Sequence, residues 1–242
     1  MRRFEIQTVS LSFFRFDRPF ARLWAFAQMG FARLPLSRIE RLGFWKLLGS
    51  GSGEGFTPVP NTSVYAILCT WPDLETATRS VEETRVFQRY RANSGENWTV
   101  FLNPIASRGN WSGTSPFEPT DANTQGPLVA LTRATIKPSI LLKFWQRVPQ
   151  ISDVIGNDPN VLFKIGIGEV PLLHQVTFSI WPDEVAMANF ARTSGPHARA
   201  IKAVRSENWF REELYARFHV VDQKGSWMGR NPLPDLNLEP VS

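Results

Sequence analysis

The sequence predicts an α+β protein in which a β-α-β-β-α-β unit occurs twice in tandem. A strand-like stretch followed by a proline turn and a helical pattern occurs at residues 8–16 and again at 128–136. A strand ending in Trp-Pro-Asp occurs at residues 63–73 and again at 175–183. A Glu-Asn-Trp triplet follows in both copies. Its tryptophan lies 27 residues after the tryptophan of Trp-Pro-Asp in the first copy and 28 residues after it in the second. Two copies of one order of signals indicate a duplicated unit.

Each element of the first copy has a local signal. TVSLSFFRF alternates apolar residues as a strand does, and ARLWAFAQMGFARL spaces them three and four apart as a helix does. GFWKLLGSGSGEG has the glycine-rich turn of a hairpin, and Asp73 stands where a helix N-cap belongs. The elements are expected at residues 8–16, 21–34, 43–55, 63–73 and 74–96, with a last strand leading to Gly109-Asn110-Trp111-Ser112-Gly113.

The second copy repeats these signals. LVALTRATI precedes the helical pattern ILLKFWQRVPQI, and LFKIGIGE matches the first hairpin when Lys164 is aligned with Lys46. The tryptophans that recur in both copies indicate packing in a core. The remaining signals are an N-cap at Asp183, a helix at 184–207, Glu207-Asn208-Trp209 matched to Glu96-Asn97-Trp98, and the turn Gly225-Ser226-Trp227-Met228-Gly229.

A β-α-β-β-α-β chain forms a four-stranded antiparallel sheet with two helices on one face, the ferredoxin-like arrangement. The other face of each sheet stays open, and two units in one chain can bury these faces against each other. The expected fold class is therefore α+β, with tandem ferredoxin-like βαββαβ repeats forming a fused dimeric α/β-barrel-type pseudo-dimer. The segments are an N-terminal repeat without cofactor at 1–113, a linker at 114–127, a cofactor-binding C-terminal repeat at 128–231 and a tail at 232–242.

Composition and charge narrow the class of protein. A hydrophobic share of 43% with 20% charged residues is that of a globular chain able to bury a core. The net charge of +5 suits an anionic membrane surface, an acidic redox partner or nucleic acid about equally. RNA-recognition modules share the βαββαβ order, but neither third strand carries their RNP1 pattern. We therefore expect no nucleic-acid partner.

Other motifs exclude further classes. The single cysteine, Cys69, lies in an apolar stretch, which fits a buried residue in a reducing cytoplasm. The apolar runs are too short or too interrupted for a membrane-spanning helix of roughly 20 residues, and the charged N-terminal stretch lacks a signal-peptide pattern. The sequence has no HExxH, paired-cysteine or Ser-His-Asp pattern, and GSGSGEG lacks the ending of a phosphate loop.

The two copies differ at places where packing alone does not require a polar residue. Three such exceptions fall in the second copy: His174, His197 and Arg133, opposite Val64, Phe87 and Phe13. Strand alternation places His174 with Phe178 on one side of its strand. That side is expected to face either the helices or the other sheet.

Two imidazoles and an arginine in one copy fit a metal or heme pocket between sheet and helix. Heme iron needs an axial side chain, commonly a histidine, in an apolar slot with cations near the propionates. His197 on the second helix of this copy is the expected axial ligand. The other expected contacts of the cofactor are Arg199, Arg205, Arg133 and Phe178. The alternative for a lone helix histidine is an ordinary surface or core role.

Long blocks of the sequence resemble one known family. They include VSLSFFRFD, GFWKLLGSGSGEGFTP, NWTVFLNPIASRGNWSG, DPNVLFKIGIGEVP followed by LLHQVTFSIWPD, and SGPHARAIKAVRSENWFREELYARF. Together they cover about residues 6–231 and are similar to the spheroidene monooxygenase (carotenoid 2-ketolase) family. Blocks of this length are far more specific than any short motif.

The resemblance implies a bacterial oxidoreductase of carotenoid biosynthesis in phototrophs, which introduces a keto group at C-2 of acyclic carotenoids such as spheroidene. It implies heme as cofactor, dioxygen as co-substrate and reduced ferredoxin as electron donor. By analogy with heme-binding dimeric α/β-barrel proteins, His197 is favoured as axial ligand and His174 is the second candidate. His174 or Arg133 is then the catalytic group that polarises bound oxygen. The alternative is a heme-binding or cofactor-free protein of this fold without carotenoid oxygenase activity.

A carotenoid substrate implies contact with a membrane. The long apolar molecule needs an apolar channel to the cofactor, and arginines near that channel would suit anionic headgroups. We therefore expect a cytoplasmic protein that also lies on the cytoplasmic face of the photosynthetic membrane. The candidate channel residues, which could also belong to an ordinary core, are Phe13, Phe14, Phe16, Trp24, Phe26 and Phe31. The candidate headgroup contacts are Arg15, Arg18, Arg22, Arg33 and Arg38.

Overall fold

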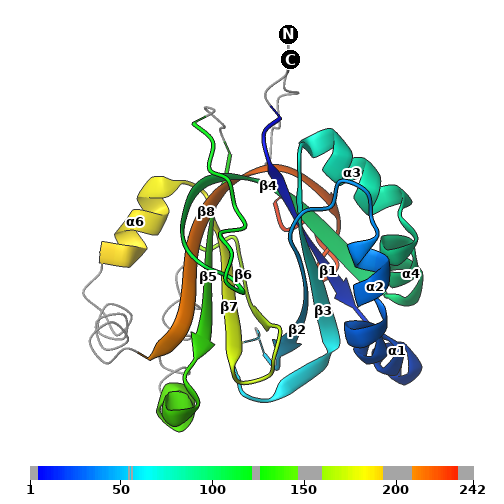
Figure 1. Ribbon diagram of the computed structural model, residues 1–242, viewed down its shortest axis with the longest axis horizontal. Coiled ribbons are helices and arrows are strands. Elements are labelled where there is room, and N and C mark those ends of the chain that lie inside the picture. Colours follow the sequence, from blue (N-terminus) through cyan, green and yellow to red (C-terminus); the bar gives the residue numbers. More distant parts are fainter. Residues whose placement is uncertain are drawn as a thin grey trace.

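The computed structural model describes residues 5–53, 55, 57–121, 126–146, 160–192 and 209–233. In this part of the chain eight strands form a closed barrel with helices on its outside (Figure 1). Helices α1 to α4 cover one side of the barrel, and α6 lies at the other side. None of the described helices is long and apolar enough to cross a membrane.

The first half supplies four strands and four helices. The helix expected at 74–96 is two helices, because Thr84 has extended backbone between them. The helix expected at 21–34 is likewise divided, near Ala32. The elements are β1 (Thr8–Arg15), α1 (Pro19–Phe31), α2 (Arg33–Ser37), β2 (Trp45–Gly51), β3 (Pro60–Trp71), α3 (Leu74–Glu83), α4 (Arg85–Asn93) and β4 (Glu96–Gly109).

The second half supplies the other four strands. The N-caps expected at Asp73 and Asp183 are confirmed, since their carboxylates accept hydrogen bonds from the backbone N–H groups of Thr76 (2.6 Å) and Ala186 (2.7 Å). The described elements are β5 (Leu128–Ile136), the 3₁₀ helix η1 (Pro138–Ile140) continued by helical residues 141–146, β6 (Phe163–Gly168), β7 (His174–Trp181), α6 (Glu184–Arg192) and β8 (Phe210–Gly225).

All neighbouring strands are antiparallel, in the order β1-β3-β2-β6-β7-β5-β8-β4. The first half contributes the run β2-β3-β1-β4 and the second half the run β6-β7-β5-β8. The runs join at a short β2–β6 seam and a long β4–β8 seam. The fold is therefore an antiparallel barrel with outer helices, and the inner faces of both runs share one interior.

Strand register shows which residues of the two halves are equivalent. Phe13 of β1 pairs with Trp98 of β4, whereas Arg133 of β5 pairs with Leu214 of β8. The predicted match of Arg133 to Phe13 is confirmed. The predicted match of Trp98 to Trp209 is wrong, because Leu214 holds that place and Trp209 precedes β8. Both tryptophans are buried, although they do not occupy equivalent places in the two halves.

The same register confirms that His174 of β7 occupies the place of Val64 of β3. The match of Lys46 to Lys164 is wrong by one residue. Lys46 lies opposite Leu68, an inner-core residue, so it points into the barrel. Lys164 falls on the other face of its strand, because successive side chains of a strand alternate between faces.

Apolar side chains form one core inside the barrel and another between the first half's sheet and helices α1 to α4. The inner core takes alternate residues of each strand, as Val9, Leu11 and Phe13 of β1 illustrate. Burial of the Cys69 thiol raises its pKa, which fits the expected core residue. The packing role of the recurrent tryptophans is confirmed by the burial of Trp71, Trp98, Trp111, Trp181, Trp209 and Trp227.

The turns after β4 and β8 have the same conformation and lie at opposite mouths of the barrel, because the two strands are antiparallel. Each turn forms hydrogen bonds with a glutamate of the other half. Glu212 accepts hydrogen bonds from the N–H groups of Ser112 and Gly113, and Glu96 accepts one from Gly229. Positive φ angles occur at Gly109, Ser112 and Gly113 in one turn and at Gly225, Met228 and Gly229 in the other.

A matched pair of glycine variants tests the β4–β8 seam. A Cβ at Gly225 would lie 2.3 Å from the carbonyl oxygen of Asn97, whereas a Cβ at Gly229 has no neighbour within 4 Å. We expect Gly229→Ala to lower the free energy of unfolding by about 1 kcal/mol through its positive φ alone. Gly225→Ala should cost clearly more, because the seam must also shift. Urea unfolding measures both losses, and equal losses would contradict the close approach.

Candidate functional site

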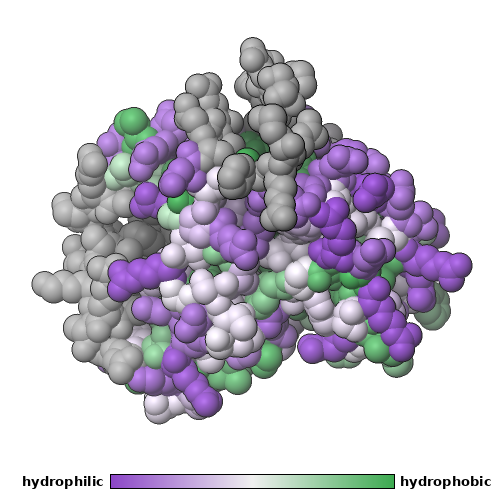
Figure 2. All heavy atoms as spheres, turned by 45° about the horizontal axis from the view of Figure 1, so that its top comes forward, coloured by the Kyte–Doolittle hydropathy of each residue, from purple (hydrophilic) through white to green (hydrophobic). Residues whose placement is uncertain are grey.

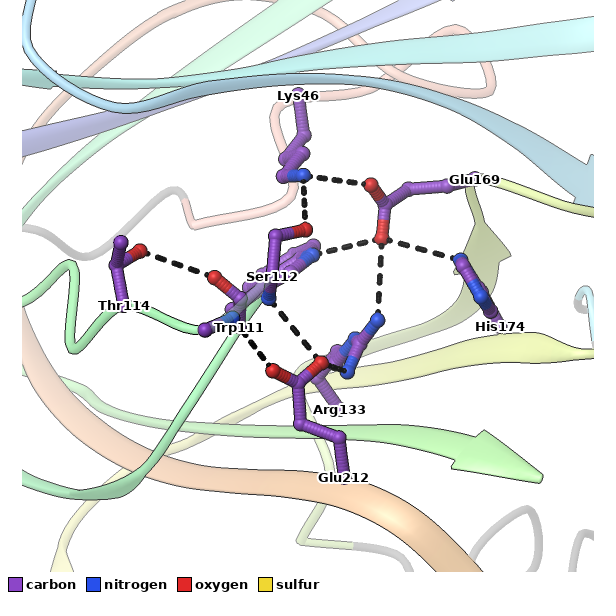
Figure 3. A network of polar contacts seen from close by, with 9 residues as sticks. Lys46, Trp111, Ser112, Thr114, Arg133, Glu169, His174 and Glu212 are labelled. Carbon is purple, nitrogen blue, oxygen red and sulfur yellow. Dashed lines mark hydrogen bonds and ion pairs between the residues drawn. The ribbon is translucent and has the colours of Figure 1, made fainter. Parts of the chain in front are cut away.

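The two mouths of the barrel differ in chemistry. At one mouth Phe13, Trp98 and Phe163 form an aromatic cluster with ring centroids 4.7 to 5.6 Å apart. At the other mouth, which Trp111 closes, Arg133 stands in the place equivalent to Phe13. Polar side chains gather around this arginine (Figure 3). The asymmetry between the halves is therefore concentrated at one end of the barrel.

Strand geometry explains why these polar side chains meet. Arg133 follows Leu131 at a spacing of two on β5, and His174 precedes Val176 at the same spacing on β7, so both point into the barrel. Glu169 follows the last residue of β6. The group, which we call the polar mouth, consists of Lys46, Arg133, Glu169, His174 and Glu212 together with the turn residues Trp111, Ser112 and Gly113.

Glu169 is the centre of the polar mouth. Its carboxylate lies 2.8 Å from Nζ of Lys46 and accepts a 2.7 Å hydrogen bond from the indole N–H of Trp111. The same carboxylate lies 3.6 Å from Nη2 of Arg133 and 3.5 Å from Nδ1 of His174. One acidic side chain thus contacts residues from both halves of the chain.

Arg133 is buried and links the two carboxylates. Its side chain is 2% exposed, and Nη1 donates a hydrogen bond to Glu212. The guanidinium also lies over the ring of Trp111, 5.8 Å from its centroid. Its Nε has no hydrogen-bond partner among the described residues. Because Glu212 binds the turn after β4 as well, Arg133 and Glu212 together fasten that turn to the second half.

Both carboxylates are held in the charged form. Burial would raise the pKa of Glu169, but hydrogen bonds from Lys46 and Trp111 and the positive charges of Lys46 and Arg133 together lower it below its ordinary value. Burial also opposes ionisation of Glu212, but the N–H groups of the turn and the contact with Arg133 lower its pKa. Two cations therefore face two anions.

His174 is the titratable group of the polar mouth that stays neutral near pH 7. Burial lowers its pKa, and this effect exceeds the attraction of Glu169, which raises it. Arg133 and Lys46 lower it further. The charges of the polar mouth are thus balanced, so they can hold the barrel end closed but leave no unpaired charge for a ligand. His174 is the group at which this site can exchange a proton.

The structure brings two of the predicted site residues together, His174 and Arg133, through Glu169. Phe178 lies inside the barrel, fully buried, with its ring centroid 5.9 Å from that of Phe13. All three face away from the helix side of their sheet. The other predicted residues, His197, Arg199 and Arg205, lie outside the described residues.

Sequence reasoning missed the partners of Arg133 and His174. Lys46 and Glu169 lie in hairpins, and only the strand register shows that they point to a common place. Glu212 could have been found from Glu96, its equivalent in the first half, which also binds the turn of the opposite half. The incorrect match of the Glu-Asn-Trp triplets hid that equivalence.

The aromatic residues expected to line a substrate channel separate into three environments. Phe13 belongs to the inner core, and Phe14 and Phe16 belong to the core beneath α1 to α4. Trp24 packs against that second core. The two that remain, Phe26 and Phe31, are exposed on the surface of α1.

At two places the outer face of the second half's sheet carries a small side chain where the first half carries a large one. Ala134 stands in the place of Phe14, and Thr177 in the place of Ile67. The start of α6 packs on this outer face, where Met187 belongs to one cluster with Leu128 and Trp181. The other small outer residues, Ala130, Thr132 and Ser179, stand where the first half has the equally small Ser10, Ser12 and Cys69.

Known proteins similar to this chain identify its family. No protein-family model matches the chain. The chain is 50% identical to spheroidene monooxygenase of Cereibacter sphaeroides over 94% of its own length and 71% of that protein. It is also 50% identical to spheroidene monooxygenase of Rhodobacter capsulatus, over 95% of this chain and 97% of that protein. The chain belongs to the spheroidene monooxygenase family.

Spheroidene monooxygenase of Rubrivivax gelatinosus is a more distant relative, 34% identical over 88% of this chain and 82% of that protein. Among solved structures, aldoxime dehydratase in complex with butyraldoxime has a TM-score of 0.59 and 10% identity, covering 90% of this chain and 81% of that one. A second aldoxime dehydratase structure has a TM-score of 0.58 and 11% identity, over 92% and 83%. These two structures share the fold of this spheroidene monooxygenase family member.

Removing Arg133 should weaken the barrel end. We expect Arg133→Met to lower the free energy of unfolding by roughly 3 kcal/mol, because it leaves two carboxylates without their buried cation. The control is Arg79→Met on the exposed surface of α3, which should change it by less than about 0.5 kcal/mol. Urea denaturation compares the two, and similar losses would mean that other contacts hold the mouth.

His174 should make the folded state sensitive to mild acid. Its pKa is lower in the folded chain than in the unfolded one, so the unfolded chain binds the proton more readily as pH falls below about 6.5. Stability contributed by neutral His174 is therefore present above that pH and lost below it. His174→Val, which copies the residue of the first half, should give a shallower fall of unfolding free energy between pH 7.5 and about pH 5.5. Parallel curves for both proteins would refute this assignment.

Proposed function

We propose that this chain uses dioxygen and reduced ferredoxin to introduce a keto group at C-2 of an acyclic carotenoid of the spheroidene type, with heme as its cofactor. The observation that carries the proposal is the 50% identity to two proteins named spheroidene monooxygenase over nearly the whole chain. The matched region covers 94% and 95% of this chain, so it spans both halves of the barrel.

We further infer that the barrel is a fused pseudo-dimer of two ferredoxin-like βαββαβ units. The identical internal order of the runs β2-β3-β1-β4 and β6-β7-β5-β8 supports this origin. So do the matched turns at Gly109–Gly113 and Gly225–Gly229. A duplicated unit leaves one copy free to take a cofactor while the other keeps a packed outer core.

The outer face of the second sheet suits a flat prosthetic group. Ala134 and Thr177 have smaller side chains than Phe14 and Ile67, which hold the equivalent places in the first half. Helix α6 begins against this face, and His197 follows its last residue by five positions. A histidine imidazole is a common axial ligand of heme iron.

In this proposal His197 would hold the heme iron, and Arg199 and Arg205 would pair with the propionates. When bound, the heme supplies the activation of dioxygen with electrons from ferredoxin. The second half's sheet and the start of α6 would exclude water from the site. His174 and Arg133 point into the barrel, on the other side of the sheet, so we assign them to holding the polar mouth. Ligation by His174 is the alternative.

Two histidine variants separate these ligands. Purified wild-type protein should show the Soret absorbance of heme, and His197→Ala should lose most of it because the iron loses its axial ligand. His174→Ala is the matched control, since it removes the other candidate imidazole, and should retain the band. Absorption spectra at equal protein concentration decide the question. Loss of the band in His174→Ala alone would reverse the assignment.

Turnover tests the reaction itself. Heme-loaded protein, reduced ferredoxin and dioxygen should convert detergent-dispersed spheroidene into a product with one more oxygen and two fewer hydrogens, detected by mass spectrometry. His197→Ala should lower the rate at least about a hundredfold, because oxygen activation needs the bound iron. A Soret band without any product would favour a heme-binding protein of this fold that is not a carotenoid oxygenase.

A further inference from the structure

One side of α1 and α2 exposes large apolar side chains to solvent. Phe20 is 87% exposed, Phe26 is 65% exposed and Phe31 is 75% exposed. Leu23 and Leu34 are exposed on the same two helices. Along α1, Phe20, Leu23 and Phe26 are spaced three apart, so they lie on one side of the helix. We call these five residues the α1–α2 face.

Packing of the helices against the barrel does not explain the α1–α2 face. The barrel side of the same helices is already apolar and buried, with Ala25 of α1 and Leu36 of α2 in the second core. Helix α1 is therefore apolar on both sides, whereas the outer side of a surface helix is ordinarily polar. In Figure 2, hydrophobic and hydrophilic atoms are intermixed at the right-hand end of the molecule, where α1 and α2 lie in Figure 1.

Within residues 18–38 the charge has one sign, and the exposed Asp17 and Glu40 border this segment. Residues 18–38 contain four arginines and no aspartate or glutamate. Arg18, Arg33 and Arg38 are exposed, and Arg22 is partly buried. A long arginine side chain can hold its guanidinium at the level of lipid phosphates while neighbouring apolar residues enter the acyl region. Exposed aromatic residues bordered by arginines therefore match an anionic bilayer surface.

A second copy of the chain is a poorer occupant. In a two-fold dimer the same face meets itself, so the arginines of one copy would approach those of the other. The segment 18–38 has no carboxylate to pair with them. Anionic phospholipid, by contrast, offers phosphates for the arginines and hydrocarbon for the phenylalanines.

We propose that the α1–α2 face inserts into the surface of a bilayer that contains anionic phospholipids. The inference deepens the proposed function and rests on it for its purpose, because a long apolar carotenoid dissolves in such a bilayer. The barrel would lie on the membrane with its first half toward the lipid.

Vesicle sedimentation with the full chain tests this proposal. The probes are vesicles of phosphatidylcholine alone and vesicles of phosphatidylcholine mixed with phosphatidylglycerol. We expect binding to the mixed vesicles that weakens as salt is raised. Phe20→Ser with Phe26→Ser should lower the partition coefficient about tenfold or more. Arg18→Gln with Arg38→Gln should lower it roughly tenfold on the mixed vesicles alone.

Matched controls remove similar side chains elsewhere on the surface. Val59→Ser with Val185→Ser removes two exposed apolar residues outside α1 and α2. Arg79→Gln with Arg108→Gln removes two exposed arginines from α3 and β4. Both controls should bind as the wild type does. Thermal unfolding followed by circular dichroism checks that each variant is folded before it is used.

Two outcomes would overturn the proposal. One is equal vesicle binding by the wild type, the Phe20→Ser/Phe26→Ser variant and the controls. The other is a wild-type dimer in analytical ultracentrifugation that becomes a monomer in the same phenylalanine variant, which would assign the face to a second copy.

Heme absorbance and turnover of detergent-dispersed carotenoid keep the two proposals separable. If the wild type turns the carotenoid over in detergent but does not bind acidic vesicles, the membrane proposal alone fails. If it binds acidic vesicles through the α1–α2 face but shows neither heme nor turnover, the proposed function alone fails.

Discussion

Backbone pairing between the halves, at the β2–β6 and β4–β8 seams, closes two four-stranded runs into one barrel, and the rest of the structure depends on that closure. Once the barrel is closed, every strand has one face in a shared interior and one face outside. An eight-stranded barrel is just wide enough for side chains to fill it, and buried residues such as Phe178 and Trp98 do so here. In our proposal the heme accordingly binds at an outer face of the sheet rather than in the interior.

The polar mouth shows what it takes to put charge into such an interior. Arg133 stands where the first half has Phe13, and a buried guanidinium without partners would be costly. Glu169 and Glu212 form ion pairs with it, and Lys46 and the turn after β4 complete the arrangement from the first half. The same charges that replace an apolar contact therefore join the two halves, in a group with no net charge left for a ligand.

The two halves divide their outer surfaces between different tasks. The first half packs bulky residues such as Phe14 and Ile67 beneath α1 to α4, and α1 still presents a second apolar side to solvent. The second half has small residues in the equivalent places, Ala134 and Thr177. In our proposals the first surface contacts lipid and the second accepts heme, so substrate and cofactor would approach one barrel from different halves. Two antiparallel four-stranded runs permit this division because each run keeps its own outer face.

The sequence alone determined the duplicated order of strands and helices, the N-caps at Asp73 and Asp183 and the exceptional places of His174 and Arg133, because these depend on local periodicity and on spacing along one chain. It misaligned Lys46 with Lys164 and Trp98 with Trp209, since similar residues in two copies do not report which residues pair across a sheet. Only the tertiary structure decided that His174 and Arg133 face the barrel interior and that Lys46, Glu169 and Glu212 surround them. The physical reason is that register and closure are long-range: a shift of one residue sends a side chain to the opposite face, and nothing local in the sequence records that choice.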